Sequence, residues 1–163
     1  MKKMNNKGFS LVELIIVIAI MAILIVVLAP QYLKYVERSR NSTDMQTATE
    51  FMDACEVWAA DPYADPGFKS GDTIKITNAT STGAATLGGS TNGDDAVTAA
   101  LKSTGLTLSD FKCQSKTAWS KLEIEGEVKA DGSIFWWSSE NGFAYRMGLP
   151  INSTGTAATA PTP

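Results

Sequence analysis

Histidine is absent from this chain of 163 residues, and cysteine occurs only twice. Zinc sites are commonly built from several cysteine and histidine ligands, so the sequence predicts no such metal site. Calcium sites made of carboxylates stay open, although no EF-hand spacing is present. Without histidine, no pair of nucleophile and general base can be proposed. The sequence therefore predicts a protein that is not an enzyme and that needs no cofactor.

Charge is spread unevenly along the chain, whose formal net charge is −3. Residues 1–8 carry three lysines and no acid, whereas Leu11 to Ala29 is apolar at every position except Glu13. Without those lysines the chain keeps 11 of its 14 basic side chains against 17 acids, a formal charge of −6. Because phosphate neutralisation supplies most of the affinity for nucleic acids, a general nucleic-acid-binding domain is not expected.

The apolar run from Phe9 to Ala29 is long enough to cross a bilayer, since about 21 residues make ~31 Å of helix. The lysines before it predict a cytoplasmic N-terminus and an outward-facing remainder. A secretory signal peptide is disfavoured, because the run leads into Pro30 without a small-residue cleavage site. A plain anchor does not explain Glu13, since an unpaired acid costs about 2.5 to 3.5 kcal/mol at the centre of a span.

The segment Lys7-Gly8-Phe9-Ser10-Leu11-Val12-Glu13-Leu14 resembles the processing signature of type IV pilins and pseudopilins. In that family a prepilin peptidase cuts after the glycine and methylates the new N-terminal phenylalanine. The resemblance therefore implies cleavage between Gly8 and Phe9, with N-methylation of Phe9. It extends over about residues 7 to 40 and places the family's conserved acid at Glu13 and its helix-interrupting proline at Pro30.

Glu13 is expected to set the register of neighbouring subunits. After cleavage, its carboxylate can meet the Phe9 amine of a neighbour when such helices pack together. A desolvated charge pair adds little net stability, but misaligned packing leaves two charges buried without partners. Pairing with the amine of its own chain, while the subunit waits in the membrane, is the alternative.

Pro30 is expected to kink or locally unwind the helix, because it lacks an amide hydrogen and clashes with the carbonyl four residues earlier. In a filament, this break would let the helix extend. The alternative is that Pro30 simply marks the end of the membrane span.

The hydrophobic pattern and the resemblance together predict an α+β fold, in which a long N-terminal helix packs on an antiparallel β-meander of three to four strands. The predicted parts are a leader peptide at 1–8, a hydrophobic transmembrane or filament-core helix at 9–30, an amphipathic helix half at 31–60, a variable αβ loop region at 61–118, an antiparallel sheet at 119–150 and a flexible Thr/Ala/Pro-rich tail at 151–163.

Alternating apolar residues and turn signals predict the shorter elements. The Asp131-Gly132 and Asn141-Gly142 pairs are typical of hairpins between strands. The expected elements are a short strand at Thr73 to Thr77, a short helix at Asp94 to Ser103, and strands at Trp119 to Val128, Ser133 to Ser138 and Phe143 to Leu149.

Cys55 and Cys113 form an even pair in a domain expected outside the membrane. We predict that a disulfide joins them and ties the long helix to the segment that enters the sheet. Two buried thiols are the alternative, because Cys55 lies on the apolar side of its helix.

The resemblance implies a structural subunit, the major pilin of a type IV pilus that serves adhesion, twitching motility or biofilm formation. Its expected partners are identical or related pilin subunits, the prepilin peptidase, the inner (cytoplasmic) membrane and the pilus assembly machinery. The precursor would cross that membrane once, and the assembled pilus would be extracellular. The alternatives are a minor pilin, a type II secretion pseudopilin, or a membrane-anchored binding module that never polymerises and keeps Met1.

Overall fold

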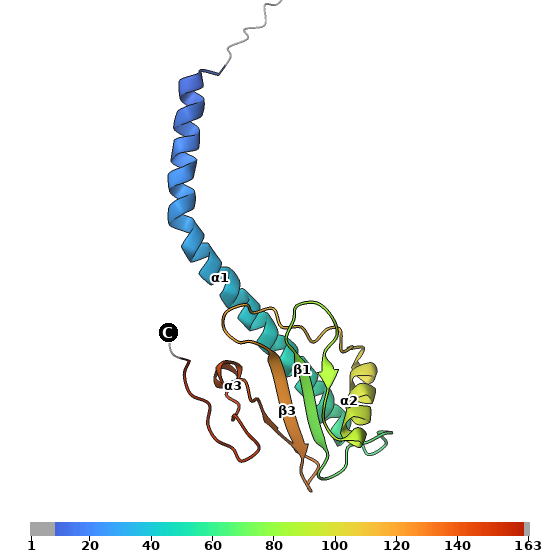
Figure 1. The fold of residues 1–163 in the computed structure, drawn as a ribbon. Helices are drawn as coiled ribbons and strands as arrows, with labels where there is room; N and C mark the ends of the chain where they lie inside the picture. Colours follow the sequence, from blue (N-terminus) through green and yellow to red (C-terminus); the bar gives the residue numbers. More distant parts are fainter. Residues whose placement is uncertain (1–8, 162–163) are drawn as a thin grey trace, which may run out of the picture. The chain divides into compact units, whose positions relative to one another are not determined.

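Helix α1 spans Leu11–Ala60 and is the longest element of the molecule (Figure 1). The structure, a computed structural model, describes residues 9–161. The chain divides into two compact units, of which the first ends at Val36 and the second begins at Glu37. The helix ends at Ala60 because Asp61 is followed by Pro62, and a residue before proline is steered away from helical geometry.

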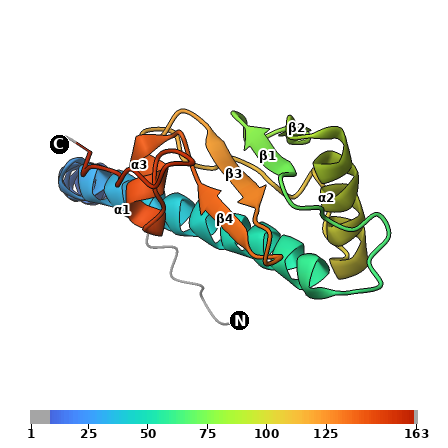
Figure 2. The same ribbon diagram turned by 90° about the horizontal axis from the view of Figure 1, so that it is seen from below.

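The second unit contains one four-stranded antiparallel sheet. Its order is β2-β1-β3-β4, so β1 and β3 are the central strands. The strands are β1 (Thr73–Asn78), β2 (Thr86–Leu87), β3 (Leu122–Val128) and β4 (Ile134–Trp137). Figure 2 shows the sheet lying across the C-terminal part of α1, as the predicted fold class required.

The core lies between the sheet and α1. Apolar side chains alternate along β1 and β3, which leaves one face of the sheet for the helix. Ile76 and Ile124 pair directly across these strands, and both are fully buried. They share one cluster with Ala48, Phe51 and Cys55 of α1, and the burial of Cys55 agrees with its expected place on the apolar side of the helix. The amphipathic pattern of the sequence is therefore confirmed.

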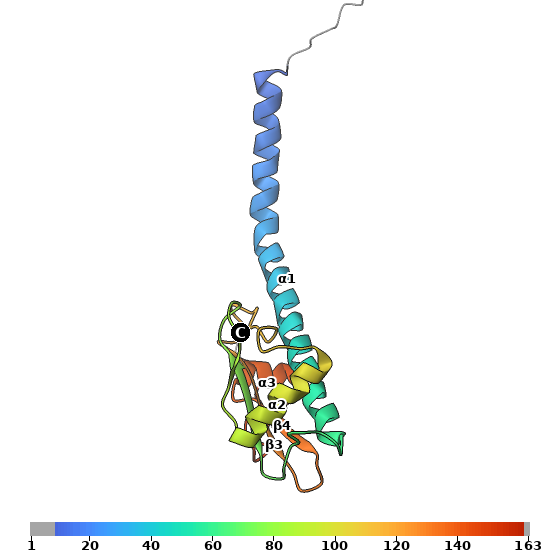
Figure 3. The same ribbon diagram turned by 90° about the vertical axis from the view of Figure 1, so that its right-hand side faces the viewer.

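The predicted hairpin at Asp131 and Gly132 is confirmed and joins β3 to β4. Gly132 adopts a φ of 84°, which L side chains rarely adopt, and the Lys129 amide donates to the Ser133 carbonyl at 2.8 Å. Figures 1 and 3 place this turn at the same end of the second unit as the end of α1.

The region between α1 and β3 has more structure than a variable loop suggests. The predicted short strand is confirmed as β1, which contributes a central strand although it lies outside the predicted sheet region at 119–150. The predicted short helix is confirmed as α2 (Thr91–Thr104). The hydroxyl of Ser90 caps its first turn, and Gly105 ends it in the left-handed conformation at φ 78°.

The predicted strand at Phe143 to Leu149 is wrong, because this segment begins as helix α3 (Asn141–Met147). The Asn141-Gly142 pair opens the helix instead of forming a hairpin. Apolar residues alternate here, but Phe143 and Ala144 are both fully buried although they are adjacent. Adjacent side chains of a strand point to opposite faces, whereas a short helix can turn both toward one core.

The C-terminal segment folds back instead of running free, as a flexible tail would. Pro150 and Ala157 form an isolated antiparallel bridge. The Asn141 side chain holds the segment further along, since it donates to the Thr159 carbonyl at 2.9 Å and accepts from the Thr159 amide at 3.0 Å.

Candidate assembly site

The N-terminal part of α1 presents an exposed apolar surface. Its large apolar side chains from Leu11 to Leu28 have exposed fractions between 49% at Val17 and 74% at Val26. Among residues 9–161, α1 is the one helix long and apolar enough to cross a membrane. An exposed apolar surface of this extent marks a lipid-facing or protein-binding segment.

Glu13 lies in the first turn of this helix, where its carboxylate caps the backbone. The amide of Ser10 donates to Oε2 of Glu13 at 3.0 Å. This is one half of a capping box, in which the third helical residue accepts from the amide of the residue before the helix. The Ser-x-x-Glu spacing could have revealed this contact, but the prediction considered only the charge of Glu13.

The predicted processing site straddles the start of the described chain. Gly8 and the leader at 1–8 lie outside the described residues. Phe9 is 87% exposed and precedes the helix. The cleavage between them and the methylation of Phe9 stay predictions.

Pro30 lies inside α1, and the helix continues on both sides of it. The local unwinding predicted as one outcome is therefore not found, and Pro30 does not end the helix. Proline has no amide hydrogen to donate, so one hydrogen bond of the helix is missing at Pro30. A kink at Pro30 stays a prediction.

Two carboxylates of α1 hold the segment that leads into β3, and the sequence did not predict this contact. Asp44 is fully buried and accepts three hydrogen bonds: from the amides of Gln114 and Ser115 at 2.7 and 2.9 Å, and from the indole N–H of Trp119 at 2.9 Å. Burial raises the pKa of Asp44 above its ordinary value, and these donors oppose the shift only in part.

Glu37 lies two helical turns before Asp44 and holds the next residues of the same segment. Its Oε1 accepts from the Ser115 hydroxyl and the Lys116 amide at 2.7 Å each, and from the Thr117 amide at 3.0 Å. Desolvation raises the pKa of Glu37, but the three donors outweigh it and lower the pKa to about 2. We call Glu37, Asp44 and residues 114–119 the carboxylate clamp.

The structure contains Cys55 and Cys113 as free, buried thiols and not as the predicted disulfide. Both belong to the same core cluster, and burial raises their pKa to about 12 and about 11. Such thiols are poor nucleophiles. In the structure, therefore, they fill the core, and a bridge in the exported protein stays a prediction.

Glu123 is another buried carboxylate, and neighbouring side chains bind it. Lys121 donates to it at 2.8 Å and Thr77 at 2.9 Å, while Ser139 also contacts it and Lys75 lies 3.3 Å away. Desolvation is outweighed by these contacts, which lower its pKa to about 2. A carboxylate held ionised in this way is a poor proton acceptor.

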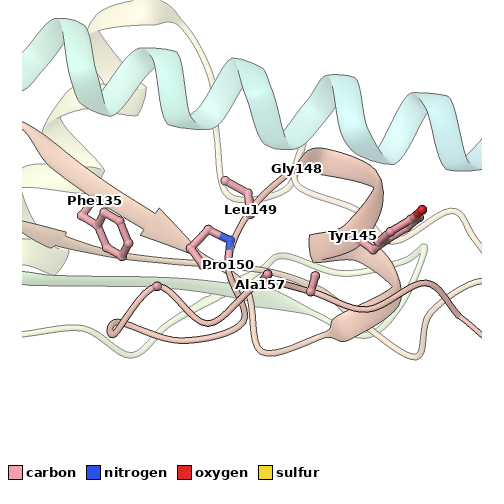
Figure 4. A pocket seen from close by; sticks show the side chains of 8 residues that line it. Phe135, Tyr145, Gly148, Leu149, Pro150 and Ala157 are labelled. Atoms are coloured by element: carbon pink, nitrogen blue, oxygen red, sulfur yellow. The ribbon is translucent and has the colours of Figure 1, made fainter.

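A hollow of about 430 Å³ lies beside β4 and the C-terminal segment (Figure 4). Its lining is mostly apolar and contains no carboxylate, lysine or arginine side chain. It includes Phe135, Tyr145, Leu149, Pro150 and Ala157.

Comparison with known proteins adds a family context to this geometry. A family model described as the prokaryotic N-terminal methylation motif matches residues 3–29. Fimbrial protein EcpC of Eikenella corrodens is 36% identical over an alignment of 170 residues that covers 100% of both chains. No solved structure matches the chain.

A second relative matches over a shorter part of the chain. Type IV major fimbrial protein FimA of Dichelobacter nodosus is 41% identical over 59 residues, which cover 36% of this chain and 38% of FimA. The chain is thus similar to EcpC throughout, and to FimA in a much shorter part.

Proposed function

This chain belongs to the type IV pilin family and is a structural subunit of a type IV pilus, and from that premise we propose that it is the major subunit, which polymerises through its N-terminal helix. The observation that carries the proposal is the exposed apolar surface from Leu11 to Leu28. That surface needs lipid before assembly and the helices of neighbouring subunits after it.

Processing and topology form part of the proposal. The precursor crosses the cytoplasmic membrane once, with residues 1–8 inside the cell. Prepilin peptidase removes them after Gly8 and methylates Phe9. Glu13 then exchanges its contact with the Ser10 amide for the Phe9 amine of a neighbouring subunit. The pilus assembly machinery extracts the helix from the membrane, and the filament lies outside the cell.

Mass spectrometry of filaments sheared from the cell surface tests this proposal. We expect this chain to dominate the filament fraction and to begin at N-methylated Phe9. An intact Met1 together with an absence of the chain from filaments would contradict both processing and polymerisation. That result would favour a membrane-anchored binding module.

The proposed roles in adhesion, twitching motility or biofilm formation follow from major-subunit status, since a filament made mostly of this chain presents its surface to the environment. A minor pilin or a type II secretion pseudopilin shares the same N-terminus. The abundance of the chain separates them, because a minor subunit would form only a small part of the sheared fraction.

A further inference from the structure

Four consecutive residues of α1 form a ring of exposed side chains shortly after the apolar run. Tyr32 and Tyr35 are 66% and 74% exposed, and Leu33 and Lys34 between them are exposed as well. Because four residues make slightly more than one helical turn, their side chains point to all sides of the helix. All four belong to the first unit of the chain. We call residues 32–35 the tyrosine collar.

The composition of the tyrosine collar fits neither water nor hydrocarbon. A tyrosine side chain has an apolar ring and a polar hydroxyl, and tyrosine is enriched where membranes meet water. A lysine near the end of a membrane span can lay its apolar stem along the acyl chains while its ammonium group reaches the headgroups. Leu33 adds a fully apolar side chain to the same turn. The collar therefore combines the side chains that are typical of the interface between a membrane and water.

The distance between the collar and Glu13 matches the thickness of a bilayer. Tyr32 lies 19 positions after Glu13 and Tyr35 lies 22 positions after it, which corresponds to about 28 Å and about 33 Å along helix α1. The hydrocarbon core of a bilayer is about 30 Å thick. From Leu14 to Ala29 every residue is apolar. When Glu13 lies at one surface of that core, the tyrosine rings therefore lie at the other.

We propose that the tyrosine collar binds the phospholipid headgroups on the outer side of the cytoplasmic membrane and sets the depth at which the precursor lies in the bilayer. The inference rests on the proposed function, because it concerns the membrane stage before assembly. The rings of Tyr32 and Tyr35 lie where the acyl chains meet the headgroups, and Lys34 reaches the lipid phosphates. The same depth keeps Glu13 at the cytoplasmic headgroups, where a carboxylate stays hydrated and avoids the energetic cost of the bilayer centre.

The arrangement of side chains around the helix favours lipid over a neighbouring subunit as the occupant. A contact with one partner helix needs an apolar stripe along one side only. Here the side chains from Leu14 to Ala29 are apolar on all sides, and the collar that follows also surrounds the helix. A bilayer contacts such a segment from every side and supplies its headgroups at the level of the collar. The collar is thus continuous with the surface that faces lipid before assembly.

Depth measurements on the full chain in vesicles test the inference. A Gln31→Cys substitution next to the collar carries a polarity-sensitive fluorophore, since the native thiols are buried. The vesicles contain phosphatidylethanolamine and phosphatidylglycerol, and quenching by spin-labelled phospholipids measures the depth of the fluorophore. Tyr32→Leu together with Tyr35→Leu should move the fluorophore toward the bilayer centre by one helical turn, about 5 Å, because leucine prefers hydrocarbon to the interface.

Two further variants serve as controls for the leucine pair. Tyr32→Trp together with Tyr35→Trp should leave the depth unchanged, because tryptophan shares the interfacial preference of tyrosine. Tyr63→Leu removes a tyrosine of the second unit that is 91% exposed, and it should also leave the depth unchanged.

A shift in the leucine pair alone supports the inference. An unchanged depth of the leucine pair, or an equal shift in either control, overturns it while leaving the proposed function intact. An unchanged depth together with fewer sheared filaments from cells would overturn it too, and would assign the collar to a contact between subunits. Failure of the unaltered chain to insert into the vesicles would overturn the membrane stage of the proposed function, and this inference with it.

Discussion

Trp119 donates its indole N–H to the carboxylate of Asp44 at 2.9 Å, across 75 positions of the sequence. This bond closes the carboxylate clamp, which fixes the entry to β3 on α1. A buried carboxylate with three N–H donors is well satisfied, whereas its removal would leave those donors without an acceptor. The clamp therefore joins the two layers of the second unit by polar contacts as well as by the core.

Replacement of Asp44 should destabilise the second unit. We expect Asp44→Ala to lower the free energy of unfolding by about 3 kcal/mol, because three donors lose their acceptor, and Asp44→Asn to cost less because it keeps one acceptor. Denaturant unfolding of the full chain in detergent, followed by circular dichroism, measures this. The control Asp95→Ala should stay within about 0.5 kcal/mol of the unaltered chain. Equal stability of both alanine variants would contradict the role of the clamp.

Glu37 should make the fold sensitive to acid. Its folded pKa of about 2 is below the ordinary value of 4.5, so its stabilising contribution is complete above pH 4.5 and is lost as the pH falls toward 2. The melting temperature should decline over this window, and Glu37→Gln should remove part of the decline. Thermal scans of both proteins from pH 7 to pH 2 measure it, and parallel curves would count against this role. Glu123 acts in the same direction and contributes equally to both curves.

Two substitutions at Glu13 separate its cap from its charge. Glu13→Gln keeps an oxygen that can accept from the Ser10 amide, whereas Glu13→Val keeps neither the acceptor nor the charge. If the charge sets register, both variants should be cleaved normally and both should fail to form filaments. Immunoblots of membranes and of sheared filaments measure the two steps. Normal filaments from Glu13→Gln would show that filament formation does not need the charge of Glu13. Normal filaments from Glu13→Val would show that it needs neither the charge nor the cap.

Thiol labelling tests whether Cys55 and Cys113 form the predicted disulfide. Neither residue should react with a maleimide in the folded protein, because both are buried. A disulfide would also prevent labelling after denaturation until a reductant is added, and it would lower the mass by that of two hydrogen atoms. Labelling of both thiols in denaturant alone would establish the free thiols seen in the structure.

Pro30→Ala should stiffen the N-terminal helix, because alanine supplies the amide hydrogen that proline lacks. The subunit should still be processed and assembled. Filaments of the variant should extend less under load than unaltered filaments, as measured by force spectroscopy on single pili. An unchanged extension would argue against Pro30 as the point of extension.

Much of this fold could be predicted from the sequence, because the patterns that indicate it are formed by residues close together in the chain. The long apolar run, the apolar side of residues 48–55 and the Asp131-Gly132 turn each depend on neighbouring residues, and the structure contains all three features. The segment from Phe143 to Leu149 was wrongly predicted as a strand, because its four alternating apolar residues fit a strand and a short helix about equally well. The burial of both Phe143 and Ala144 against the core favours the helix over the strand.

By itself, the sequence determined the N-terminal segment of the protein: an apolar helix of membrane length, one acid in its first turn and a processing motif before it. These features need no partner from elsewhere in the chain. Tertiary structure alone decided the role of Glu37 and Asp44, for which the sequence predicted no contact. Their donors lie more than 65 positions away, and only folding brings such donors to a carboxylate and withdraws both from water.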